Sequence, residues 1–179
     1  ECAELVRQND KTGFHQDKYN WLAAIQQHPA PTSFEIATQL FEFFFAEDDI
    51  ERVGIIQIWK KLASHQSSQT AADRNLAMLW RQLGVLETVQ GHLDLAQEYF
   101  LKAIEVQKGL EDRLMLGNDY FELGLVYRNL GDYQRAWDAF NTSVQYAREA
   151  KNLYTVIYSQ GQLANILAVQ SHFGEAVDI

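Results

Sequence analysis

Histidines and carboxylates that could support acid–base or metal chemistry stand close together at three places in this 179-residue chain. They are His15 with Asp17, His92 with Asp94, and His172 with Glu175. A zinc site needs convergent ligands, as in the His-Glu-x-x-His pattern, and no such pattern is present. No serine stands in a Gly-x-Ser-x-Gly setting, and the single cysteine, Cys2, is terminal. The sequence therefore predicts no catalytic group, no metal site and no cofactor.

An internal repeat organises the second half of the chain. Leu83-Gly84 recurs 40 residues later as Leu123-Gly124, and a third copy begins 40 residues further on at Leu163-Ala164. Each copy continues into a turn, at Gly91-His92, Gly131-Asp132 and Ser171-His172. Two of the histidines above thus belong to turns of the repeat, which indicates a structural role for them.

The residues of each copy have the spacing of a packed helix pair. Leu93, Phe100 and Ile104 recur at helical spacing and make the second helix apolar on one side. Gly124 stands in the middle of a helix, where glycine costs about 1 kcal/mol relative to alanine, so we expect it to mark a tight contact with Ala136 on the facing helix. A helix pair of this kind must stack on its neighbours to bury its apolar face. The sequence therefore predicts an all-α fold, an α-α superhelix built as a solenoid of antiparallel helix pairs.

We expect the chain to have two parts. Residues 1–66 would hold N-terminal helices at about 17–28, 32–45 and 50–64, the last two forming a degenerate helical repeat. Residues 67–179 would hold the regular repeats at about 71–110, 111–150 and 151–179. Their helices are expected at about 71–90, 92–108, 111–130, 132–149, 151–170 and 172–179. The third repeat is truncated, so we expect the parent protein to carry more repeats.

These residues resemble the tetratricopeptide repeat. Residues 117–144 carry the pattern best, with Leu123, Gly124, Tyr127, Gly131, Asp132, Tyr133, Ala136 and Phe140 in place. The first copy departs from it at Glu87 and His92, and the third at Ala164 and Ser171. The long period resembles repeat arrays of bacterial signalling proteins. The N-terminal Trp21-Leu-Ala-Ala-Ile25 helix, proline break and aromatic helix pair resemble the start of the repeat arm in signal-transduction ATPases such as the maltose-regulon activator.

The resemblance implies a binding protein without catalytic activity. We expect a protein- or peptide-binding scaffold, the sensor or interaction arm of a larger bacterial signalling protein. The alternative is a peptide-pheromone receptor domain of a quorum-sensing regulator, which uses similar long repeats. No phosphate-loop motif is present in this chain.

The resemblance also implies which residues bind the partner, because in this family the first helix of each pair lines the concave face. The inner positions that we assign to partner binding are Arg81, Asn118, Phe121, Leu125, Arg128, Tyr158 and Asn165. Arg81 and Arg128 would flank an apolar floor, which favours an acidic peptide segment or a carboxylate. Asn118 and Asn165 would hydrogen-bond the backbone of an extended peptide.

Charge and hydropathy narrow the classes of partner. The net charge of −9 disfavours nucleic-acid binding, because phosphate contacts need clustered Lys and Arg. No apolar run is long enough to cross a bilayer and no secretory signal is visible, so a cytoplasmic protein without membrane partners is expected. The truncated C-terminal end carries apolar residues, and we expect it to self-associate through Leu167 or Val169.

Overall fold

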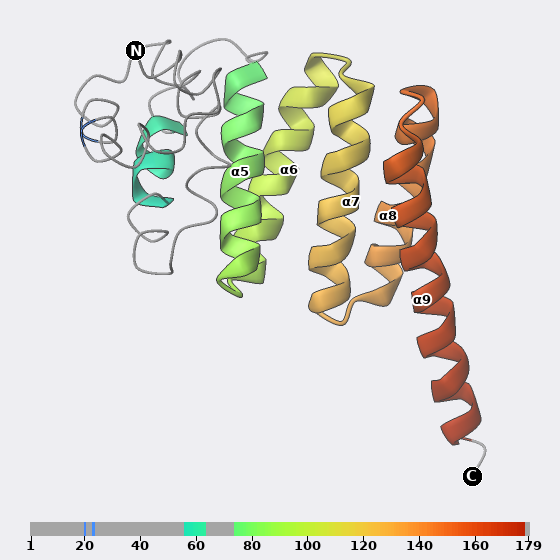
Figure 1. Cartoon of the computed structure of the whole chain (residues 1–179). Helices are drawn as coiled ribbons and strands as arrows, with labels where there is room; N and C mark the ends of the chain where they lie inside the picture. Colours follow the sequence, from blue (N-terminus) through green and yellow to red (C-terminus); the bar gives the residue numbers. More distant parts are fainter. Residues whose placement is uncertain (1–19, 21–22, 24–55, 64–73, 178–179) are drawn as a thin grey trace.

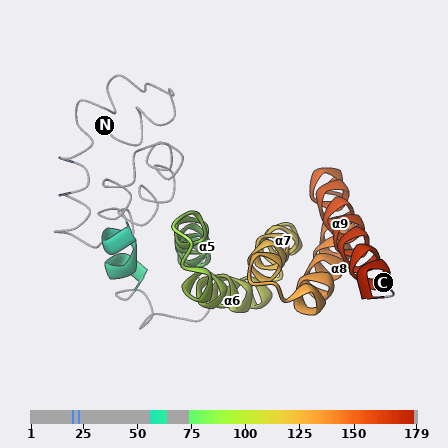
Figure 2. The same ribbon diagram turned by 90° about the horizontal axis from the view of Figure 1, so that it is seen from below.

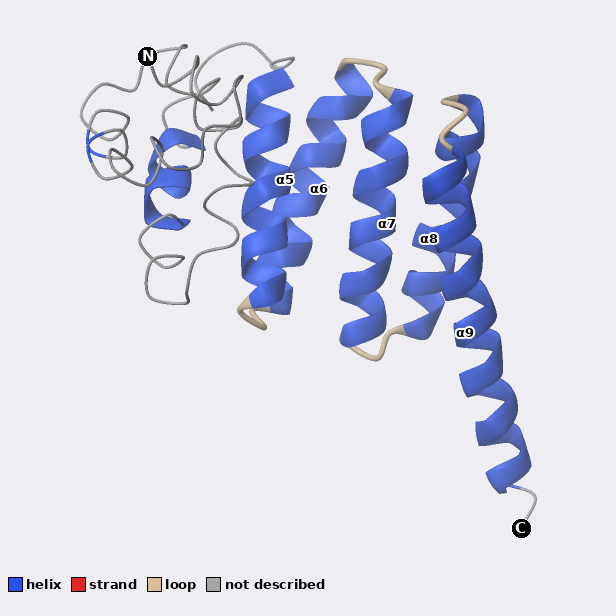
Figure 3. Cartoon of the chain, in the orientation of Figure 1, coloured by secondary structure: helices blue, strands red, loops and turns tan. Residues whose placement is uncertain are grey.

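The computed structural model describes residues 20, 23, 56–63 and 74–177, with side chains as far as residue 170 (Figure 1). In this part of the chain the regular structure is helical, and short loops join the helices (Figure 3). Beside the helical residues 56–63, the helices are α5 (Arg74–Val89), α6 (Leu93–Gly109), α7 (Arg113–Asn129), α8 (Tyr133–Glu149) and α9 (Leu153–Val177). The helices expected at 17–28 and 32–45, and the boundary at residue 66, lie outside the described residues, apart from residues 20 and 23.

The five helices form two layers. Seen along their axes, α5, α7 and α9 lie on one side, and α6 and α8 lie on the other (Figure 2). Each of α5 and α7 packs most extensively on the helix that follows it. Equivalent helices begin 40 residues apart, α6 at Leu93 and α8 at Tyr133. The predicted all-α solenoid of helix pairs is confirmed.

Four turns of the same geometry join these helices. In each, one residue adopts a left-handed conformation: Gly91, Glu111, Gly131 and Lys151, with φ between 53° and 79°. The residue that follows directly precedes the next helix and caps it, and at Asp112, Asp132 and Asn152 its side chain accepts a hydrogen bond from a backbone N–H of the first turn. Such caps satisfy donors that have no partner within the helix. The turns therefore set the antiparallel helix pairs in register.

Helix α9 differs from the prediction. A turn was expected at Ser171-His172 with a further helix from 172, but α9 runs without a break from Leu153 to Val177. The earlier turns each contain a residue with positive φ, and the stretch 153–177 contains none. Ser171 stands at the position of Gly91 and Gly131, and serine favours less than glycine the left-handed conformation that follows α5 and α7.

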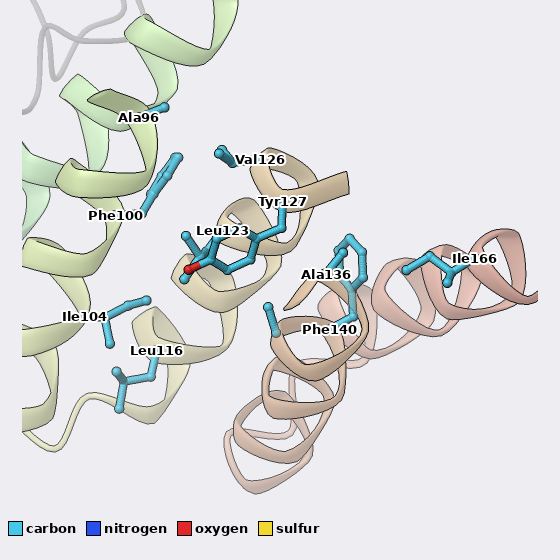
Figure 4. Close-up of a cluster of buried hydrophobic side chains, with 11 residues drawn as sticks. Ala96, Phe100, Ile104, Leu116, Leu123, Val126, Tyr127, Ala136, Phe140 and Ile166 are labelled. Carbon is cyan, nitrogen blue, oxygen red and sulfur yellow. The ribbon is translucent and has the colours of Figure 1, made fainter. Parts of the chain in front are cut away.

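A core of buried hydrophobic side chains joins the helices, and it includes two phenylalanines, Phe100 and Phe140 (Figure 4). Phe100 and Phe140 are fully buried, each facing a glycine of the preceding helix. A Cβ atom on Gly124 would lie 2.6 Å from Cε1 of Phe140, and one on Gly84 would lie 2.9 Å from Cε1 of Phe100. The tight contact predicted at Gly124 is therefore made with the ring of Phe140 rather than with Ala136, because the ring reaches further across the helix pair.

The helical residues 56–63 pack against α5. Their contacts explain why the first repeat differs from the tetratricopeptide pattern at two positions, Glu87 and His92. The Nε1 atom of Trp59 donates to Gln82 at 2.8 Å. The buried carboxylate of Glu87 lies 2.7 Å from Nζ of Lys60 and 2.8 Å from Nδ1 of His92. Glu87 and His92, which replace the Tyr and Asp of the pattern, thus form one polar network with the preceding helix.

Candidate binding groove

A cavity of about 290 Å³ lies where α5, α7 and α9 meet the turn before α9. We call this cavity the groove; its lining residues are Arg81, Asn118, Phe121, Glu122, Asn152, Tyr154, Thr155 and Tyr158. The structure thus brings together four of the seven residues assigned from the sequence, Arg81, Asn118, Phe121 and Tyr158. Leu125, Arg128 and Asn165 lie on the same helices but do not line the groove.

Two tyrosines form the most exposed wall of the groove. Tyr154 and Tyr158 stand one turn apart on α9, and their ring centroids are 4.2 Å apart. The two residues are 68% and 48% exposed, respectively. Phe121 lies opposite on α7, anchored against the buried ring of Phe140 at a centroid distance of 5.8 Å. The groove therefore offers exposed aromatic surface on Tyr154 and Tyr158.

A chain of hydrogen bonds fixes the orientation of the Asn118 amide. The backbone N–H of Thr155 donates to Oδ1 of Asn152 at 3.3 Å, which identifies the oxygen of that amide. The Asn152 nitrogen must then face the other way, and it donates to Oδ1 of Asn118 at 3.3 Å. The Thr155 hydroxyl donates to the same oxygen at 2.7 Å.

The nitrogen of Asn118 is consequently turned away from this network. Among the described residues it has no hydrogen-bond acceptor, although the residue lines the groove. An amide held in one orientation with a free N–H₂ group is a ready donor for a carbonyl oxygen. Asn118 was predicted from the sequence to bind the partner. Asn152 and Thr155, which orient its amide, were not predicted, because they lie more than 30 residues away in the chain.

The pair of positive charges that the sequence predicts in the groove, Arg81 and Arg128, is not found there. The Nη1 atom of Arg81 lies 3.2 Å from Oδ1 of Asp119, a carboxylate with 0% of its side chain exposed. Its Nη2 atom lies 4.0 Å from Glu122. Arg128 donates to Gln162 and Asn129 and stays outside the groove. Arg81 thus faces two acidic side chains, and Arg128 lies elsewhere, so the groove does not hold the expected pair of positive charges.

Burial perturbs both of these carboxyl groups. It raises the pKa of Asp119 to about 7 against the opposing effect of Arg81, and Oδ2 of Asp119 has no hydrogen-bond partner in the described part of the chain. Burial also raises the pKa of Glu122, again opposed by Arg81. The 40-residue repeat indicates that position 119 is buried, because Leu79 and Ser159, which occupy the same position in the neighbouring repeats, are both buried. A carboxylate at a buried position needs a partner, which here is Arg81.

Stability should therefore fall as pH rises. The folded chain keeps the proton of Asp119 up to about pH 7, whereas the unfolded chain, with a pKa near 3.8, releases it earlier. The free energy of unfolding should decrease between these two pH values and level off above pH 7. In Asp119→Asn the decrease should be markedly smaller, as measured by urea unfolding at pH 5, 6 and 7. The matched control is Asp138→Asn on α8, and an equal change of slope in both variants would contradict the assignment.

The described residues give no sign of a metal site or a membrane span. No group of three or more His, Cys, Asp or Glu side chains among them could hold a metal ion. Every helix in the described part of the chain is too short or too polar to cross a bilayer.

Comparison with known proteins supports the repeat assignment. Residues 75–149 match the tetratricopeptide repeat family, a span that covers α6, α7 and α8 and nearly all of α5. No match is found among curated proteins.

Several solved structures share the fold. Two crystal structures from Podosopora anserina, described as kinesin light chain nearly identical TPR-like repeats, align at 18% identity. They have TM-scores of 0.73 and 0.72, over 99% of this chain and 88% and 89% of those chains. The structure of BtubC (BKLC) from P. vanneervenii aligns at 12% identity with a TM-score of 0.66, over 95% of this chain and 80% of that one. At these identities the likeness shows a tetratricopeptide-like solenoid and nothing finer.

Proposed function

We propose that this chain is a non-catalytic scaffold that binds an extended peptide segment of a partner protein in the groove between α5, α7 and α9. The observation that carries the proposal is the oriented amide of Asn118 beside the uncovered rings of Tyr154 and Tyr158. The match to a repeat family of interaction scaffolds supports the same class of function.

The groove has the chemistry that an extended peptide needs. The free N–H₂ group of Asn118 would donate to a backbone carbonyl of the peptide. This contact would position the peptide backbone whatever side chains the peptide carries. The aromatic rings would take the side chains on either side of that carbonyl, because aromatic anchors supply most of the binding energy at such sites. Leu125, Arg128 and Asn165 would extend the contact along the same face.

The test uses a library of nine-residue peptides with acetylated and amidated ends, arrayed and probed with the fluorescently labelled chain. Wild-type protein should bind a subset of peptides, and Asn118→Ala should weaken binding about fivefold or more, the value of a lost hydrogen bond to an oriented donor. Asn141→Ala on α8 is the matched control and should bind like wild type. Equal binding by both variants would contradict the proposal.

A finer assignment follows from the resemblance seen in the sequence. We propose that the scaffold is the sensor or interaction arm of a larger bacterial signalling protein in the cytoplasm, and the alternative is a peptide-pheromone receptor domain. The neighbouring domains discriminate between the two. An adjoining phosphate loop in the full-length gene product favours the ATPase arm, whereas an adjoining helix-turn-helix favours the receptor.

We also propose that α9 mediates self-association. Ile157 and Leu167 are exposed, whereas their equivalents on α7, Gly117 and Tyr127, are buried. An apolar stripe left uncovered on a helix favours association with a second apolar face. Sedimentation velocity should show concentration-dependent dimers, and the double variant Ile157→Lys, Leu167→Lys should be monomeric. A monomeric wild-type chain at high concentration would exclude this interface.

A further inference from the structure

We propose that the peptide bound in the groove carries a basic side chain, lysine or arginine, which lies between the Glu122 carboxylate and the rings of Tyr154 and Tyr158. This inference rests on the proposed function and gives the partner a chemical class. The sequence led us to expect an acidic ligand, so the proposed charge of the ligand is the opposite of the expected one.

The distribution of charge in the groove supports a cationic ligand. Arg81 and Glu122 are the two charged residues that line it. Arg81 donates a hydrogen bond from Nη1 to the buried Oδ1 atom of Asp119, 3.2 Å away, and is 21% exposed. Glu122 is left with one weak contact, 4.0 Å from Nη2 of Arg81.

The carboxylate of Glu122 is therefore a charged group of the groove that has only this long contact among the described residues. Its side chain is 28% exposed, and it accepts no hydrogen bond from any described residue. An incoming ammonium or guanidinium would supply the missing donors in a charge-assisted contact. An acidic side chain would instead bring a second carboxylate beside that of Glu122.

The tyrosine rings favour the same ligand. The faces of aromatic rings, including that of tyrosine, attract the cationic groups of Lys and Arg. Tyr154 and Tyr158 are exposed and line the same cavity as Glu122, so one basic side chain can contact all three. The net charge of −9 draws cationic segments toward the chain as a whole.

The experiment uses peptide pools that differ at one fixed position. Each pool contains capped nine-residue peptides with a fixed central residue, Lys, Arg, Ala, Glu or Asp, and a random mixture of residues other than cysteine elsewhere. Capping removes the terminal amine, which could itself act as the cation. Binding of the labelled chain is measured by fluorescence anisotropy at low and high salt.

Wild-type protein should bind the Lys and Arg pools about fivefold more tightly than the Glu and Asp pools, with a smaller ratio at high salt. In Glu122→Gln the ratio of affinities between the basic and the acidic pools should fall to about one. Glu105→Gln, at an exposed position on α6, is the matched control and should keep the preference.

Two outcomes would overturn the inference. A preference for acidic pools would do so, as would a basic preference that persists in Glu122→Gln. If Asn118→Ala weakens binding to every pool but none of the pools is preferred, the groove binds peptides and only the choice of a basic side chain is wrong. If no pool binds, both this inference and the proposed function fail.

Discussion

Replacing Gly124 with alanine should destabilise the chain by about 1–3 kcal/mol, although alanine is the better helix former. The added Cβ would meet the Phe140 ring at 2.6 Å, closer than real side chains approach one another. Phe140 is fully buried in the core cluster, so its ring cannot move aside without disturbing α8. Gly124→Leu should cost more, because its whole side chain would have to enter the space of the ring.

Gly161 provides the matched control. It also lies within a helix of the first-helix layer, but a Cβ atom there would have no neighbour within 4 Å. Gly161→Ala should therefore stabilise the chain by up to about 1 kcal/mol through helix propensity alone. Urea unfolding followed by circular dichroism measures both variants. If the two substitutions shift the midpoint in the same direction, the contact between Gly124 and Phe140 does not hold the helix pair together.

Features encoded within one repeat could be predicted from the sequence. Gly84 and Gly124 mark the close approach of two helices, and Gly91 and Gly131 mark the left-handed turns between them. Each of these features depends on residues less than 20 positions apart. The helix pairs and their order were therefore accessible from residue types and spacing.

Features that join different repeats were not accessible in this way. The ion pair between Arg81 and Asp119 spans 38 residues and depends on how α5 is rotated relative to α7. The sequence indicates that both residues belong to first helices, but an inward position and a buried one differ by a small rotation of the helix. As a result the sequence predicted a positive groove, whereas the structure pairs that charge inside the fold.

The orientation of Asn118 was hidden for the same reason. It depends on Asn152, which caps α9, and on Thr155, and both belong to the next repeat. A capping residue such as Asn152 is recognised in a sequence from its immediate neighbours. Here Asn152 also donates a hydrogen bond to Asn118 on the neighbouring helix α7. The groove is thus assembled from three helices and one turn, and its geometry depends on how successive repeats stack.

The largest effect on binding should come from the aromatic wall of the groove. Tyr158→Ala should weaken binding of the tightest library peptide about 30-fold, which corresponds to the roughly 2 kcal/mol expected of an aromatic anchor. Tyr158 is the cleaner choice for this test, because its ring contacts the exposed Tyr154 in a tilted arrangement, whereas Phe121 also packs on the core residue Phe140. Truncating Tyr158 should therefore change affinity with little change in stability.

The measurement is isothermal titration calorimetry with that peptide, alongside urea unfolding of each variant. Leu101→Ala, which removes an exposed apolar side chain from α6 in the opposite layer, should leave affinity unchanged. The double variant Phe121→Ala, Arg128→Ala probes the wider face of α7, because it combines a residue that lines the groove with one beyond it. Wild-type affinity in both Tyr158→Ala and this double variant would place the binding surface elsewhere. The second layer, formed by α6 and α8, would then be the surface to examine, since its exposed side chains include Leu95 and Leu101.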